Sequence, residues 1–310
     1  MESNQYAMMN DKVVEYFPLE EYINRIKLLP RVLEHLDDTN NAFKDYINKI
    51  GAYDEKYIID YWVYLLYEEL RFNQQIEHPV DYSQIDLQND EVFFDTLSIS
   101  NRRIHNLHNF AVKNEYDPTF EYRKSEVQVS RLVEGKEQII YRGAQAADLE
   151  KFMNDFIKIY KRNDVSLLMS NPFLKSALIH LLFLRIHPYA DGNGRTARLL
   201  HNSKFTASIN SIYGTKLRIS PLNLSGSILL NKISYIKAVD NIYFDLEHDT
   251  NEAINNWFDF ILNMADEQIY YSSSKLDYID SSFLKADADE DHVIDMNRKM
   301  KVRSLTNKNR

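Results

Sequence analysis

The chain has 310 residues, 44% hydrophobic and 27% charged, which is ordinary for a globular protein with one large domain or two smaller ones. Its formal net charge of −9 disfavours general nucleic-acid binding, and no apolar stretch is long enough to span a bilayer. Cysteine is absent, which excludes disulfides and thiolate metal sites. Glycine and proline, seven of each, are too few for a many-turned β protein, so a mainly α fold is predicted.

The start of the chain is polar and lacks the order of a signal peptide, which is compatible with a cytoplasmic protein. Helices are predicted over 18–75, and the clearest run extends from Asp54 to Glu77, with apolar residues at helical spacing. Pro79 should stop it, because the residue before a proline avoids helical geometry. Helical spacing resumes over about 91–114.

A β-hairpin interrupts the helical pattern. The stretches Val127–Val129 and Ile139–Tyr141 alternate between apolar and polar residues and are joined through Glu134-Gly135. Helices then return over 146–162 and over Asn171–His187. The second should be deeply buried, because the run FLKSALIHLLFLRI is apolar on nearly all sides.

Pro188 places His187 in the last turn of this helix, and the next helix should begin near Arg195. Residues 226–247 and 251–271 complete the predicted helices. After about 272 the chain turns polar, and the stretch ADADED and the basic C-terminus predict an exposed, loosely ordered tail.

The densest chemistry lies in HPYADGNGRTAR, from His187 to Arg198. Two glycines around Asn193 allow successive N–H groups to face one point, and the following helix adds its positive N-terminal end. Arg195 and Arg198 share one face of that helix, and each guanidinium can bind two phosphate oxygens. The segment therefore predicts a cradle for a polyphosphate.

Asp191 and His187 add a carboxylate and an imidazole to this cradle. A carboxylate beside phosphates is the usual protein ligand of Mg²⁺, and a neutral imidazole suits a general base. The residues thus predict nucleotidyl or phosphoryl transfer to a hydroxyl. GxxxxGK[ST], GxGxxG and HExxH motifs are absent, and His105 and His108 lack a third ligand nearby, so they are interpreted as ordinary histidines.

The segment resembles the signature of the Fic-domain family, H-P-[FY]-x-[DE]-G-N-G-R-x-x-R, and all nine specified positions match. The resemblance extends over roughly 90–265 and implies a helical bundle with a short β-hairpin flap next to the active-site loop. Its implied domains are an N-terminal helical region over 1–90, a Fic domain over 91–265, and a C-terminal helix and polar tail over 266–310.

The resemblance implies a protein adenylyltransferase that transfers AMP from ATP to a Ser, Thr or Tyr hydroxyl of a target protein or of itself. His187 would be the base, and Asp191 would hold Mg²⁺. The implied phosphate ligands are Gly192, Asn193, Gly194, Arg195 and Arg198. Tyr235, Asn241 and Tyr243 are candidates for the nucleoside pocket, and Lys124, Ser125, Glu126 and Val127 for the flap that docks the target by strand addition.

The stretch NQQIEH, from Asn73 to His78, is similar to the inhibitory helix of many Fic proteins, [ST]-x-x-x-E-[GN]. Glu77 matches the acid that would pair with Arg198 and displace the γ-phosphate. Asn73 stands where the motif has Ser or Thr, and His78 where it has Gly or Asn. The alternative is a helix-end acid with an ordinary surface contact.

Other functions stay open from the sequence. The same site could remove AMP from a modified protein, with Glu77 orienting a water, or could transfer another nucleotide. A helical interaction module regulated by a nucleotide, with contacts through YYSSSKLDYIDSSF, is a third hypothesis. The target protein and the oligomeric state are not predicted, although self-association bears on any inhibition; a membrane partner is not expected.

Overall fold

A computed structural model of the chain describes residues 12–53, 55–77, 99–113, 115–133, 135–215, 217, 219–249 and 251–286. His78, Pro79, the first part of the predicted helix at 91–114 and the charged C-terminal tail from 287 onward lie outside these residues. Within the described part, no helix has both the length and the apolar character needed to cross a membrane.

The fold is mainly helical, as predicted, with one two-stranded antiparallel hairpin in the described part of the chain. The helices up to the hairpin are α2 (Leu19–Arg25), α3 (Pro30–Gly51), α4 (Glu55–Glu77) and α5 (Asn101–Ala111). After strands β1 (Gln128–Val133) and β2 (Lys136–Arg142) come η3 (Ala146–Asp148), α6 (Leu149–Lys161), α7 (Leu167–Ser170), α8 (Pro172–Ile186), α9 (Asn193–Tyr213), α10 (Leu224–Leu230), α11 (Lys232–Asp240) and α12 (Asn251–Ala286).

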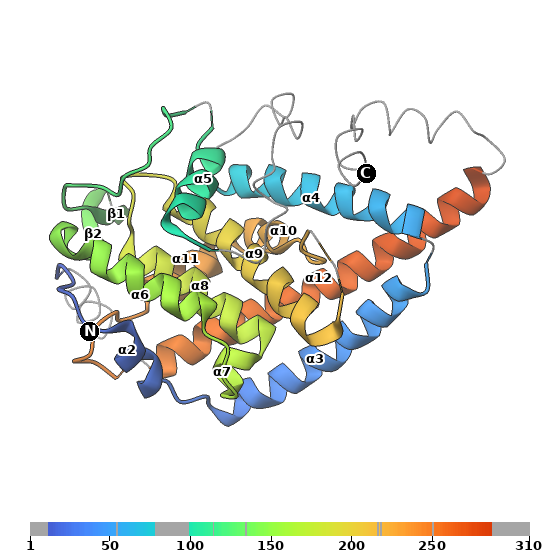
Figure 1. Ribbon diagram of the computed structural model, residues 1–310, viewed down its shortest axis with the longest axis horizontal. Coiled ribbons are helices and arrows are strands. Elements are labelled where there is room, and N and C mark those ends of the chain that lie inside the picture. Colours follow the sequence, from blue (N-terminus) through green and yellow to red (C-terminus); the bar gives the residue numbers. More distant parts are fainter. Residues whose placement is uncertain are drawn as a thin grey trace.

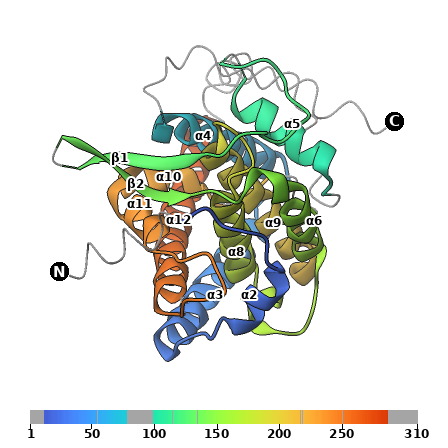
Figure 2. The same cartoon turned by 90° about the vertical axis from the view of Figure 1, so that its left-hand side faces the viewer.

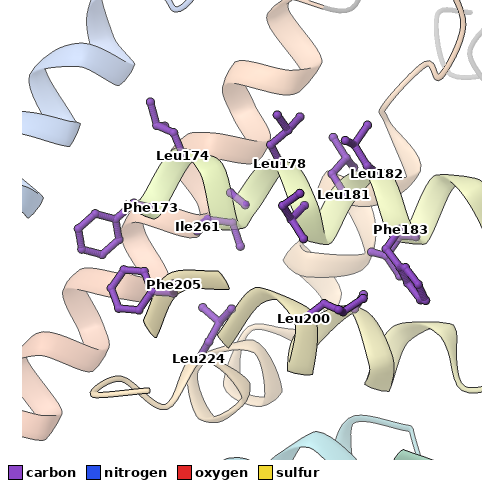
Figure 3. Close-up of a cluster of buried hydrophobic side chains, with 14 of the residues drawn as sticks. Phe173, Leu174, Leu178, Leu181, Leu182, Phe183, Leu200, Phe205, Leu224 and Ile261 are labelled. Atoms are coloured by element: carbon purple, nitrogen blue, oxygen red, sulfur yellow. The ribbon is translucent and has the colours of Figure 1, made fainter. Parts of the chain in front are cut away.

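Helix α8 is the centre of the core, and every one of its residues is buried. Asn171 caps its start, because its Oδ1 accepts from the N–H groups of Phe173 at 2.9 Å and Leu174 at 3.2 Å, while Pro172 fits the first turn. Figure 3 shows side chains of α8 packed against residues of the neighbouring helices α9 and α12. Each fully buried Leu or Phe contributes about 1.5–3 kcal/mol, so this packing fixes the helix that leads into the site.

Long helices enclose α8 and α9. In Figure 1, α3 and α12 run side by side, and α4 crosses the opposite side of the molecule. Tyr61 on α4 ties these helices together, since its hydroxyl donates to the Ser272 carbonyl of α12 at 2.9 Å and also meets the Tyr46 hydroxyl of α3. The C-terminal end of α4 thereby lies over the start of α9.

The hairpin projects from the helical body (Figure 2). Its register pairs Val129 with Tyr141 and then Ser130 with Ile139, which leaves a β-bulge between the two pairs. The turn between Val133 and Lys136 contains Gly135 with φ 78°, a conformation that glycine adopts without steric cost. The hairpin predicted from the alternating residues is confirmed.

Two sequence expectations were wrong. The helix predicted to end at 271 continues to Ala286, and polar residues of the added turns contact α3. Lys49 of α3 donates to the Ser273 hydroxyl at 3.0 Å and pairs with Asp277 at 2.6 Å. The helical stretch predicted over 226–247 divides at Asn231, and it ends at Asp240 rather than at residue 247.

Candidate active site

His187 follows the last residue of α8 and has a left-handed backbone, with φ 55° and ψ 59°. In the described chain it is the only non-glycine residue with positive φ. This conformation costs a residue with a side chain roughly 1–2 kcal/mol, so it persists only where neighbouring groups hold it. One such contact is its own N–H, which donates to the Phe183 carbonyl at 3.0 Å.

The His187 ring is held in one tautomer. Nδ1 lies 3.2 Å from the Leu184 carbonyl oxygen, which can only accept, so Nδ1 carries the proton and Nε2 keeps its lone pair. Burial lowers the pKa of His187 to about 4, and the cations of Arg123 and Arg185 act in the same direction. The ring is therefore neutral at physiological pH and can accept a proton at Nε2.

The loop after His187 is fixed by Asn193. Its side chain accepts from the Tyr189 N–H at 3.0 Å and donates to the Tyr189 carbonyl at 2.8 Å. The Tyr189 ring stacks on His108 with centroids 3.6 Å apart, and its hydroxyl lies 2.7 Å from His105 Nδ1. Both histidines are thus engaged with this core tyrosine, and no group of three or more metal-ligating side chains occurs in the described residues.

Asp191 extends from this loop with about half of its side chain exposed. Its Oδ1 accepts from the Gly192 N–H at 2.6 Å, and its Oδ2 accepts from the Tyr116 hydroxyl at 2.9 Å. Arg195 Nη2 lies 3.5 Å from the same Oδ2. A half-exposed carboxylate at the start of a helix suits a cation that keeps most of its water, as Mg²⁺ does.

Helix α9 begins directly after Gly192, which has φ 77°. The first N–H groups of a helix have no partner within it, so Asn193, Gly194 and Arg195 present their amides at the positive end of the helix dipole. The predicted helix start at Arg195 is two residues late. At Gly194, a Cβ atom would lie only 2.7 Å from Glu77 Oε1, so the Glu77 carboxylate sits against this helix start.

Arg195 is almost fully buried and is held by three acceptors. Its Nη1 donates to the Glu115 carboxylate and, at 3.3 Å, to Gln74 Oε1 of α4. With the weaker contact to Asp191, these groups direct the guanidinium toward the loop from which α9 begins. The cation therefore stands beside the loop that leads into the first turn of α9.

Arg198 is fully buried and is bound by two residues of α4. Its Nε donates to Asn73 Oδ1 at 2.6 Å, and its Nη2 donates to the Asn73 carbonyl at 3.1 Å and to Glu77 Oε1 at 2.8 Å. Burial favours the neutral form of Glu77, but the charge and hydrogen bond of Arg198 outweigh this and lower its pKa. Both partners are thus charged in this ion pair.

Asn73 explains how this helix departs from the [ST]-x-x-x-E-[GN] pattern. Its side-chain oxygen accepts from Arg198, and its side-chain nitrogen donates to the Arg195 carbonyl of α9 at 3.2 Å. Ser and Thr have a shorter side chain with a single hydroxyl, which reaches less far than these two separate amide atoms. The side chain is 2% exposed, so it works as an internal connector between α4 and α9. The other departing position, His78, lies outside the described residues.

The candidate nucleoside residues lie on α11 and directly after it. Tyr235 is buried, with its hydroxyl 3.0 Å from His180 Nε2, and it interacts electrostatically with Arg198. Asn241 is exposed at the end of α11, and Tyr243 stacks on His248. Tyr235 is therefore next to Arg198 of α9.

The candidate flap residues precede β1. Lys124 is exposed and pairs with Glu121 at 2.6 Å, whereas Glu126 accepts from the Ala146 N–H at 2.9 Å. The carbonyls of Ser125 and Val127 accept from Arg123 at 2.7 Å and from the Gly143 N–H at 3.2 Å. The segment is thus anchored on one side through its backbone, while its lysine faces solvent.

Three residues at this site are not among the site residues predicted from the sequence. Glu115 and Tyr116 come directly after the helix predicted over 91–114, yet they bind Arg195 and Asp191. Arg123 lies beside the predicted hairpin, and its guanidinium reaches the His187 carbonyl. All three are single polar residues in an irregular segment, and only the fold brings them to the loop.

Residues 98–203 match the Fic/DOC family, and they contain α5, the hairpin, α8 and the first part of α9. This stretch of the chain is similar to the Fic/DOC domain. The fold agrees over a longer stretch. A Fic family protein from Desulfovibrio desulfuricans G20 has a TM-score of 0.57 at 15% identity, covering 84% of this chain and 77% of that one. A Fic domain containing signaling protein from Bacteroides thetaiotaomicron VPI-5482 has a TM-score of 0.53 at 15% identity, covering 78% and 98%.

Curated proteins match this chain over short segments. The protein adenylyltransferase Fic of Nematostella vectensis is 48% identical over 56 residues, which are 18% of this chain and 13% of that protein. The protein adenylyltransferase fic-1 of Caenorhabditis elegans is 50% identical over 40 residues, 13% of this chain and 8% of its own length. The chain therefore shares only a small part of these relatives.

Proposed function

We propose that the protein is a nucleotidyltransferase that moves AMP from ATP to a Ser, Thr or Tyr hydroxyl of a protein, which includes the chain itself as an acceptor. The observation that carries this proposal is the joint between α8 and α9. One loop holds a neutral imidazole with Nε2 ready to accept a proton, and the same loop opens a helix with buried arginines at its start. The matching segments of protein adenylyltransferases favour AMP as the transferred group.

The reaction assigns one task to each part of the loop. The acceptor oxygen forms a bond to the α-phosphorus of ATP, and the bond between that phosphorus and the oxygen of the leaving pyrophosphate breaks. The proton of the acceptor hydroxyl moves to His187 Nε2. The amides of Gly192, Asn193 and Gly194 would face phosphate oxygens, with the guanidinium groups of Arg195 and Arg198 further along the chain of phosphates. Asp191 would hold Mg²⁺, which supplies positive charge beside the phosphates.

Glu77 is proposed to inhibit this activity. Its carboxylate pairs with Arg198 at 2.8 Å and lies against the backbone of Gly194. A terminal phosphate that bound Arg198 would have to approach a like charge, which costs free energy in a site where the arginine is fully buried. ATP and Glu77 therefore compete for one guanidinium.

Replacement of Glu77 is expected to raise AMP transfer. We expect Glu77→Gly and Glu77→Gln each to increase the rate by roughly 5–150-fold, the range that a coupling free energy of about 1–3 kcal/mol gives. The measurement is mass spectrometry of the protein after incubation with ATP and Mg²⁺, which detects a covalent AMP adduct. Glu68→Gln, on the same helix but bonded to Tyr64 and Tyr271, is the matched control and should behave like the parent protein.

A panel of nucleotides tests the transferred group. If Glu77→Gly forms an adduct of UMP or phosphate in preference to AMP, the nucleotidyl site stands but the assignment to AMP is wrong. If neither Glu77 variant forms any adduct above Glu68→Gln, inhibition by Glu77 is refuted. Release of AMP from a modified protein that is lost in Glu77→Gln would instead assign the site to hydrolysis.

A further inference from the structure

Arg123 is buried beside the flap, and its guanidinium donates to backbone carbonyls, while Glu126 Oε2 lies 4.0 Å from its Nη1. Nε donates to the His187 carbonyl at 2.7 Å, and Nη1 donates to the Ser125 carbonyl at 2.7 Å. Nη2 contacts the Ala144 and Ile186 carbonyls. One cation therefore joins three segments: the flap, the chain after β2 and the end of α8.

The His187 backbone depends on this contact. Its left-handed conformation is strained, and Arg123 binds its carbonyl through Nε while the Arg123 N–H donates to the Pro188 carbonyl at 3.0 Å. A cation at the C-terminal end of a helix is also favoured by the helix dipole. The Arg123 side chain at the end of α8 thus fixes the direction of the backbone at His187, directly after the helix.

The flap is attached at the same point. Arg123 binds the Ser125 carbonyl, and the neighbouring Val127 carbonyl accepts from Gly143. A Cβ atom on Gly143 would lie 2.9 Å from Arg123 Nη2, 3.0 Å from His187 Cβ and 3.1 Å from Val127 Cγ2. Flap, guanidinium and imidazole therefore meet around one residue that has room only for glycine.

We infer that Arg123 is a positioning residue that sets the distance between the flap and His187 and holds His187 in its left-handed conformation. The inference rests on the proposed function, because it gives the flap the role of carrying the acceptor hydroxyl. An acceptor laid along the flap and a base at the end of α8 must meet within hydrogen-bond reach for proton transfer. Arg123 fixes that separation without touching either reacting group.

The test compares Arg123→Met and Arg123→Lys with Arg102→Met. Arg102 is exposed and lines the same groove as Arg123, so its loss removes one positive charge nearby without removing the carbonyl contacts. Two measurements need no activity: NMR titration of the His187 ring, and hydrogen exchange of the amides of β1 and β2. Lysine keeps the charge, but its single ammonium cannot span carbonyls of three segments.

Arg123→Met should raise the pKa of His187 from about 4 toward its ordinary value, because a neighbouring cation and a fixed conformation are both lost. Arg123→Lys should leave that pKa low. In both variants, the rate of hydrogen exchange of the β1 and β2 amides (flap exchange) should rise by about 10–100-fold, the factor expected when one hydrogen bond to a charged group is lost. If Arg123→Met does not fold, flap exchange in Arg123→Lys decides alone. Flap exchange no faster than in Arg102→Met would overturn the inference.

The activity measurement separates this inference from the proposed function. In the Glu77→Gly background, Arg123→Lys should lower kcat for AMP transfer about 10²-fold, as a misplacement of about 1 Å does, and leave the Kd for ATP unchanged. An equal loss in ATP affinity would show a general structural role instead. If Glu77→Gly itself transfers nothing, the proposed function fails, whereas the titration and exchange results still decide the role of Arg123.

Discussion

Replacing His187 with alanine is expected to lower the rate of AMP transfer by about 10²–10⁴-fold, the usual contribution of a positioned general base. The measurement is the rate of adduct formation in the Glu77→Gly background, in which the proposed inhibition is removed. The Kd for ATP should stay close to that of the parent, because the amides and arginines that would bind phosphates begin at Gly192. A variant that transfers AMP as fast as its parent would refute the role of His187 as base.

His187→Asn provides the matched control for the backbone. Asparagine accepts the left-handed conformation better than alanine does, because its short side chain can hydrogen-bond locally. Both variants lack the imidazole and should lose transfer equally. The free energy of unfolding of His187→Ala should in addition be lower than that of His187→Asn, by about 1 kcal/mol. Residual transfer in His187→Asn but not in His187→Ala would mean that loop geometry, and not proton transfer, accounts for the loss.

The pH dependence should identify the same group. Because burial lowers the pKa of His187 to about 4, kcat/KM should stay flat as the pH falls through the ordinary histidine range and should reach half its value near pH 4. The sign for stability is the same: the unfolded chain binds a proton at higher pH than the folded one, so this contribution is complete above the unfolded pKa and is lost as the pH falls toward 4. A half-point near 6.5 would contradict the buried, neutral base.

Gly192→Ala is the second change with a large expected effect. A Cβ atom there would lie 2.4 Å from Val112 Cγ1, and the backbone has φ 77°. We expect the free energy of unfolding to fall by about 2–5 kcal/mol, the sum of about 1–2 for the left-handed conformation and about 1–3 for overpacking. Urea unfolding of the parent and the variant measures it.

Gly214→Ala is the control for this substitution. Gly214 ends the same helix with φ 64°, and a Cβ atom there would meet nothing within 4 Å. Its replacement should cost only about 1–2 kcal/mol, from the conformation alone. An equal decrease in the free energy of unfolding of the two variants would show that the close approach of Val112 to Gly192 does not affect stability.

The sequence predicts the elements whose causes are local. The cap formed by Asn171 and Pro172, the apolar run of α8 and the glycine of the hairpin turn all act within a few residues, and each appears at the expected place. The loop from His187 to Arg198 is predicted in the same way, because its proline, glycines and arginines and their spacing indicate where one helix ends and the next begins.

The sequence does not predict contacts that the fold makes between distant residues. The polar end of α12 stays helical because Ser273 and Asp277 meet Lys49 of α3, a partner far away in the chain. Glu115, Tyr116 and Arg123 reach the site in the same way. Asn231 divides α10 from α11, although no glycine or proline at this point indicates a break in the helix. Its side chain donates to the Ser227 carbonyl at 3.0 Å.

The attachment of α4 bears on the inhibition proposed for Glu77. Tyr61 anchors the front of this helix to α3 and α12, whereas Glu77 sits at its far end, where Lys232 binds the Ile76 carbonyl from the start of α11. Under the inhibition proposed for Glu77, release of Arg198 therefore needs only the last turn of α4 to unwind, while the rest of the helix stays docked. Under the same proposal, loss of the contact between Lys232 and the Ile76 carbonyl would loosen this last turn from the start of α11.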